Sequence, residues 1–126
     1  MKYPSPAQDR QRVYMAAFDK RIRERLRALV SEEIIEEHRR KPVGQHSDVL
    51  ERLLNYFRRG ALKGKLGLFQ ANPNVPSYQI VRFSGSPAIP PVVEGNEVFD
   101  SLDAAYHAVF LRRIAELMAD NPKGVP

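Results

Sequence analysis

The chain has 126 residues and a net charge of +5, with 43% hydrophobic and 28% charged residues and no cysteine. These values are typical of one globular domain, residues 1–126, and they exclude disulfides, thiolate metal sites and thiol nucleophiles. No apolar run approaches the ~20 residues that a membrane helix needs, and the N-terminus lacks the apolar stretch of a signal peptide. We therefore expect a cytoplasmic protein.

The positive charge is concentrated in the first half of the chain. Residues 1–60 hold 14 Lys and Arg against 9 Asp and Glu, whereas residues 61–126 hold 6 of each. A basic half is typical of a protein that binds nucleic acid or an acidic protein partner. It is also typical of solvated helix faces, which are more common.

Helical periodicity dominates the N-terminal half. Residues 1–7, with two prolines, are expected to form an extended arm. Apolar residues at spacings of three and four then predict a helix over residues 8–30. A break at Ser31, which can cap the next helix, precedes a short helix that ends near Arg40. A third helix is predicted over residues 47–59.

The period changes in the second half of the chain. Residues 65–70 and 77–83 predict two strands joined by a long loop, and a short third strand is expected around 97–99. The last helix is predicted over residues 101–119, with a serine that can cap its start, and a frayed tail follows over 120–126. The predicted fold class is α+β, with a helical N-terminal half, a small antiparallel β-hairpin sheet and a long C-terminal helix.

Side chains that could support catalysis or bind a metal are few. The histidines His38, His46 and His107 have no paired metal-ligand spacing. His38 lies beside two glutamates, and we interpret this segment as an exposed acidic helix turn rather than a metal site. Asp103 lies four residues before His107 on a helix, a spacing that more often gives a surface pair than an oriented base. No catalytic, cofactor-binding or metal-ligating residue is therefore assigned.

Arg113 falls in the middle of the apolar stripe of the last helix. A buried guanidinium needs a partner, which is either an acidic group within the chain or a group across a subunit interface. The same helix carries Leu111 and Met118 on its far side, so it is apolar around more than half of its circumference. We interpret this helix as part of a subunit interface, with a helix sandwiched inside the domain as the alternative.

Helices followed by a hairpin are also typical of a winged helix–turn–helix protein. The 47–59 helix would then be the recognition helix, with Arg52, Arg58 and Arg59 near DNA phosphates. Glu51 interrupts this basic face, and the hairpin loop carries no Lys or Arg. A small basic DNA-binding regulator is therefore kept as the alternative function.

Three sequence strings resemble those of a known family. They are Ile35-Glu36-Glu37-His38, Asn55-Tyr56-Phe57-Arg58 and His107-Ala108-Val109-Phe110-Leu111-Arg112-Arg113-Ile114. With their order and spacing, these strings make the chain similar, over roughly residues 10–117, to the small subunit of bacterial N,N-dimethylformamidase.

The resemblance implies a non-catalytic chain that assembles with a much larger catalytic subunit. In that family the large subunit holds a mononuclear iron bound by tyrosines and a glutamate, and the enzyme hydrolyses N,N-dimethylformamide to dimethylamine and formate. Attack of metal-activated water on the amide carbonyl is the chemistry expected in the partner, and no cofactor is expected in this chain. We expect the subunit interface to include nine residues of the third and last helices: Asn55, Tyr56, Phe57, Arg58, His107, Phe110, Leu111, Arg112 and Arg113.

Overall fold

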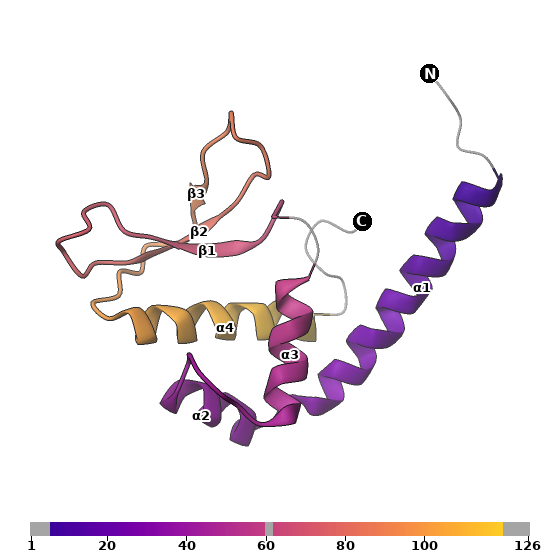
Figure 1. The fold of residues 1–126 in the computed structure, drawn as a ribbon, viewed down its shortest axis with the longest axis horizontal. Helices are drawn as coiled ribbons and strands as arrows, with labels where there is room; N and C mark the ends of the chain where they lie inside the picture. The colour runs from indigo at the N-terminus through magenta and orange to yellow at the C-terminus, as the bar shows by residue number, and fades with distance from the viewer. Residues whose placement is uncertain (1–5, 60–61, 120–126) are drawn as a thin grey trace.

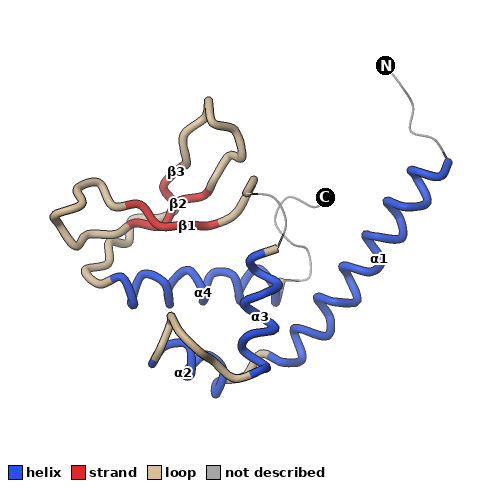
Figure 2. Tube along the Cα trace, in the orientation of Figure 1, coloured by secondary structure: helices blue, strands red, loops and turns tan. Residues whose placement is uncertain are grey.

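The computed structural model describes residues 6–59 and 62–119, drawn by chain position in Figure 1 and by secondary structure in Figure 2. The helices are α1 Pro6–Leu29, α2 Glu32–Arg40, α3 Asp48–Arg58 and α4 Leu102–Met118. The strands are β1 Leu66–Phe69, β2 Gln79–Arg82 and β3 Val92–Val93. The predicted α+β class, with helices first, a small antiparallel sheet and a long C-terminal helix, is confirmed. No helix among the residues described here combines the length and the apolar character needed to cross a membrane.

Serine side chains define the starts of three helices. Ser31, Ser47 and Ser101 each accept a hydrogen bond from the backbone N–H three residues further along the chain. Each bond satisfies a donor that the first helical turn leaves without an intrahelical partner. The predicted break at Ser31 and the predicted starts of the second, third and last helices are therefore confirmed.

The predicted N-terminal arm is wrong for its last two residues. Pro6 and Ala7 belong to the first turn of α1 rather than to an extended segment. Proline suits this position because the first N–H groups of a helix have no partner within it, and because its fixed φ is already helical. Residues 1–5 of the predicted arm, and the predicted tail at 120–126, lie outside the described residues.

The sheet has the strand order β1-β2-β3, and both pairings are antiparallel. The third strand lies at β3, not at 97–99 as predicted. In the 97–99 segment, Phe99 forms an isolated bridge with Tyr78 just before β2. Ile80 and Leu66 of the sheet pack on Val109 of α4 in a small apolar cluster.

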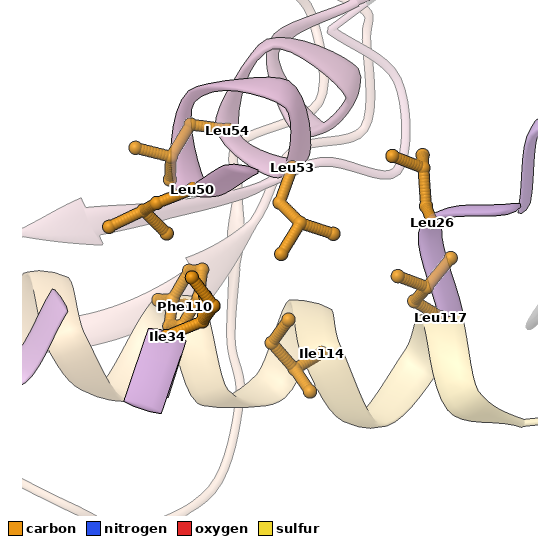
Figure 3. Close-up of a cluster of buried hydrophobic side chains, with 8 residues drawn as sticks. All are labelled: Leu26, Ile34, Leu50, Leu53, Leu54, Phe110, Ile114 and Leu117. Carbon is orange, nitrogen blue, oxygen red and sulfur yellow. The ribbon is translucent and has the colours of Figure 1, made fainter. Parts of the chain in front are cut away.

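The main core joins all four helices. Figure 3 shows its eight buried side chains, which are Leu26, Ile34, Leu50, Leu53, Leu54, Phe110, Ile114 and Leu117. α4 contacts the sheet on one side and α2 on another, and Figure 1 shows it running between them. The last helix is therefore covered on two sides within the fold, whereas Leu111 and Met118 on its far side stay 41% and 49% exposed, and the interpretation of that side as a subunit interface stays a prediction.

Candidate functional site

Three histidines that are distant in sequence meet where the end of α2, the 41–47 loop and the first half of α4 come together. The Nδ1 atoms of His38 and His107 are 3.0 Å apart, and the ring of His46 lies 6.1 Å from that of His38. The ring of His38 stacks on Phe110 with the centroids 4.0 Å apart. The interpretation of His38 as part of an exposed turn is therefore wrong, since only 3% of this residue is exposed.

The surroundings of the two paired histidines keep them neutral. Burial, together with the electrostatic effects of His107, His46 and Arg113, lowers the pKa of His38 to about 4. Burial also lowers the pKa of His107. Two neutral imidazoles can share one hydrogen bond when one Nδ1–H donates and the other Nδ1 accepts. The pair therefore satisfies one polar atom of each ring without a buried charge.

The two Nδ1 atoms are close enough to bind one metal ion, but a stable protein site needs more ligands than two. Within 6–59 and 62–119, no group of three or more His, Cys, Asp or Glu side chains is arranged to hold a metal. His107 pairs with His38 rather than with Asp103, the neighbour expected from its spacing. The histidine pair does not supply the ligand set of an iron centre.

The third histidine fixes the loop that connects α2 to α3. The ring nitrogens of His46 lie 3.1 Å from Glu51 Oε1 and 2.6 Å from the backbone oxygen of Lys41. At the end of the same loop, the backbone N–H and the hydroxyl of Ser47 each donate a hydrogen bond to the carboxylate of Glu37 of α2, both at 2.7 Å. These two bonds lower the pKa of Glu37. His46 and Glu37, the polar side chains next to the histidine pair, are therefore engaged in contacts that hold the loop in place.

Arg113 finds its partner on the sheet. Its Nη2 donates a hydrogen bond to the backbone oxygen of Leu66 at 3.1 Å. The ion pairs found between described residues, at N–O distances up to 4.0 Å, do not include Arg113. Burial lowers the pKa of this guanidinium, and the nearby Arg58 lowers it further. Arg113 also lines two open cavities of about 380 and 360 Å³ on its two sides.

The sequence matches the family described as N,N-dimethylformamidase alpha subunit over residues 13–123. The chain belongs to this family. The N,N-dimethylformamidase alpha subunit of Alcaligenes sp is 34% identical over 122 residues, which cover 93% of this chain and 90% of the relative. The alpha subunit of Paracoccus aminophilus is 32% identical over 119 residues, which cover 90% of this chain and 82% of the relative.

Membership of the N,N-dimethylformamidase alpha-subunit family confirms the resemblance drawn from the short sequence strings. The match also favours the subunit interpretation over the DNA-binding alternative, because the matched relatives are named as one subunit of an N,N-dimethylformamidase. In this alpha-subunit fold, the strings around His38 and His107 are the parts of α2 and α4 that meet at the histidine pair. Two of the three sequence strings that carry the resemblance therefore contain the residues of a contact within this chain, between His38 and His107.

The nine predicted interface residues lie at three depths. Phe110 is 2% exposed and fills the core of this chain. Tyr56, Phe57, His107, Arg112 and Arg113 are half-buried, and Asn55, Arg58 and Leu111 are exposed. Contact of these residues with another subunit stays a prediction. Phe110, however, is buried within this chain and has almost no surface left for another subunit. The predicted interface is therefore limited to the exposed and half-buried residues.

An ion network that the sequence did not indicate joins the sheet to α4. Arg82 of β2 pairs with Glu94 and, at 2.6 Å, with Glu116 of α4. Arg112 of α4 joins the network at Glu94, 3.6 Å away, and also pairs with Glu97 at 3.1 Å. These carboxylates raise the pKa of Arg82 above its usual value. No local signal could have paired these residues, because the two carboxylates of Arg82 come from segments 12 and 34 residues away.

Proposed function

We propose that this chain is the non-catalytic small subunit of an N,N-dimethylformamidase-like amidohydrolase. The observation that carries the proposal is the match, along about nine-tenths of the chain, to proteins named as one subunit of that enzyme. The complex cleaves the C–N bond of N,N-dimethylformamide and releases dimethylamine and formate. In this proposal a large partner subunit holds the catalytic iron, this chain stabilises it, and the complex works in the cytoplasm.

The chemistry of the described residues supports a structural role. Hydrolysis of an amide needs a base or a metal with an open coordination position next to the substrate. His38 and His46 line the cavity of about 360 Å³ beside Arg113. His38 is a poor base there, because its pKa is about 4 and its Nδ1 is bonded to His107. The nitrogens of His46 face Glu51 and the backbone of Lys41.

The test is reconstitution from separately and jointly expressed subunits. This chain alone, the large subunit alone, and the co-expressed pair are assayed for dimethylamine release from N,N-dimethylformamide, and each sample is analysed for iron. We expect activity and iron in the co-expressed pair and neither in this chain alone. Hydrolysis of the amide by this chain alone would overturn the proposal.

A substitution at the histidine pair tests the non-catalytic role inside the complex. His107→Gln keeps a polar side chain next to His38 but removes the imidazole. We expect the assembled complex with this variant to keep its kcat within about twofold, since no group that touches substrate has changed. A fall in kcat of a hundredfold or more, about 2.7 kcal/mol in the barrier, with the complex still assembled, would instead give His107 a catalytic role.

A further inference from the structure

The first half of α1 projects away from the rest of the fold (Figure 1). Every side chain from residue 10 to residue 18 is exposed, and we call this segment the projecting half of α1. Three of its large apolar side chains are mostly in solvent: Tyr14 is 75% exposed, Met15 64% and Phe18 60%. A short helix without tertiary packing is only marginally stable in water. This segment lacks such packing among the described residues.

The exposed apolar residues continue a stripe that is covered in the second half of α1. Ile22, Leu26 and Leu29 pack in or against the main core. Phe18 and Met15 lie one and two turns further toward the N-terminus on the same face, at spacings of four and seven from Ile22. One helix face is therefore buried by α3 and α4 at one end and uncovered by the described residues at the other.

The charge of α1 indicates what covers the uncovered half. Seven Lys and Arg and three Asp and Glu lie between residues 6 and 29. The exposed cations Arg12, Arg21 and Arg25 flank the apolar stripe on its two sides. A second copy of this chain packed along the stripe would bring like charges together, which is unfavourable. An apolar groove with acidic edges complements both the stripe and its flanks.

We propose that the projecting half of α1 docks into an apolar, acid-edged groove on the large subunit and is a principal contact between the two chains. This inference rests on the proposed function, because it takes the large subunit as the partner. It adds α1 to an interface that the sequence predicts on the third and last helices. It also explains why large apolar side chains stand in solvent on a segment that nothing in the described fold covers.

The test measures the affinity of this chain for the purified large subunit, by calorimetry or interferometry, with charge placed on the stripe. Met15→Glu/Phe18→Glu changes two exposed side chains, so the fold should keep its circular dichroism spectrum and Tm. We expect an affinity at least tenfold weaker than that of the wild type, because buried aromatic anchors carry much of the energy of an interface. The matched control is Ile89→Glu, at a side chain that is 58% exposed in the loop before β3, with unchanged affinity expected.

A second variant tests the acidic edges of the groove. Arg21→Glu/Arg25→Glu reverses two exposed charges and leaves the apolar stripe intact. We expect slower association with the large subunit and a weaker dependence of the association rate on salt than in the wild type. Amide hydrogen exchange should show residues 10–18 exchanging rapidly in the free chain and protected in the complex.

The outcomes separate this inference from the proposed function. If the wild-type chain fails to bind the large subunit, the proposed function falls and the docking inference falls with it. If the wild type binds and Met15→Glu/Phe18→Glu binds equally well, the docking inference is overturned and the proposed function stands. If the isolated wild type is a dimer that the double variant dissociates while the complex with the large subunit is unaffected, the occupant is a second copy and the inference is again overturned.

Discussion

The buried histidine pair predicts a specific loss of stability in mild acid. The pKa of His38 falls from 6.5 in the unfolded chain to about 4 in the folded protein. Because the pKa of His38 is lower in the folded protein than in the unfolded chain, the unfolded chain binds the proton at a higher pH. Its contribution to stability is therefore complete above pH 6.5 and is lost as the pH falls toward 4.

The size of the effect follows from the two pKa values. Proton linkage gives a loss of about 2 kcal/mol in the free energy of unfolding between pH 8 and pH 5, and about 3 kcal/mol once the pH is below both values. Since His38 is 3% exposed, solvent screening does not reduce this figure much. Burial of the ring is the largest cause of the lowered pKa, and the electrostatic effects of His107, His46 and Arg113 add to it. The carboxylate of Glu37 acts in the opposite direction and raises the pKa.

Urea unfolding at pH values from 8 to 5 measures this slope. His38→Phe keeps a flat ring against Phe110 and removes the titrating group, and the half-buried His107 can still bond to water. We expect the variant to lose about 2 kcal/mol less than the wild type over this range. An NMR titration of the imidazole protons gives the pKa of His38 directly. An equal pH slope in the two proteins, or a His38 pKa near 6.5, would refute the reasoning.

Three further substitutions test the packing, with urea unfolding at pH 7 as the common measurement. Leu50→Ala leaves a cavity at a side chain that is 0% exposed and should cost about 3 kcal/mol, and a cost under 1 kcal/mol would place Leu50 outside the core. Arg82→Met removes the cation that pairs with both Glu94 and Glu116 and should cost about 2 kcal/mol. Ser101→Ala removes the cap of α4 and should cost about 1 kcal/mol, whereas Ser101→Asp should restore most of it.

The predictable parts of this fold are those with a local physical cause. Serine caps act within one turn, so Ser31 and Ser101 could be assigned as helix starts from the sequence alone. The strand at Val92–Val93 was missed because two residues next to several prolines carry no alternation to detect.

The candidate site depends on long-range contacts, which periodicity does not encode. His38 and His107 are 69 residues apart in sequence, so no spacing rule could pair them, and His38 looked like part of an exposed acidic turn. The breadth of the apolar surface on α4 favoured a subunit interface, with a helix sandwiched inside the domain as the alternative. The sheet and α2 cover part of this surface within the chain, while Leu111 and Met118 stay 41% and 49% exposed, and only the tertiary fold determines which sides are covered.

The position of α4 in the chain has a consequence for biosynthesis. Phe110, Ile114 and Leu117 supply the surface on which Leu26 and the side chains of α2 and α3 pack. Arg27 also donates to the backbone oxygen of Leu117, a contact that spans 90 residues. A nascent chain that has not yet exposed α4 outside the ribosome therefore holds three helices that contact one another but lack the α4 side chains that complete their core. The core is complete only once the last helix has emerged, and until then apolar side chains of the first three helices are open to aggregation.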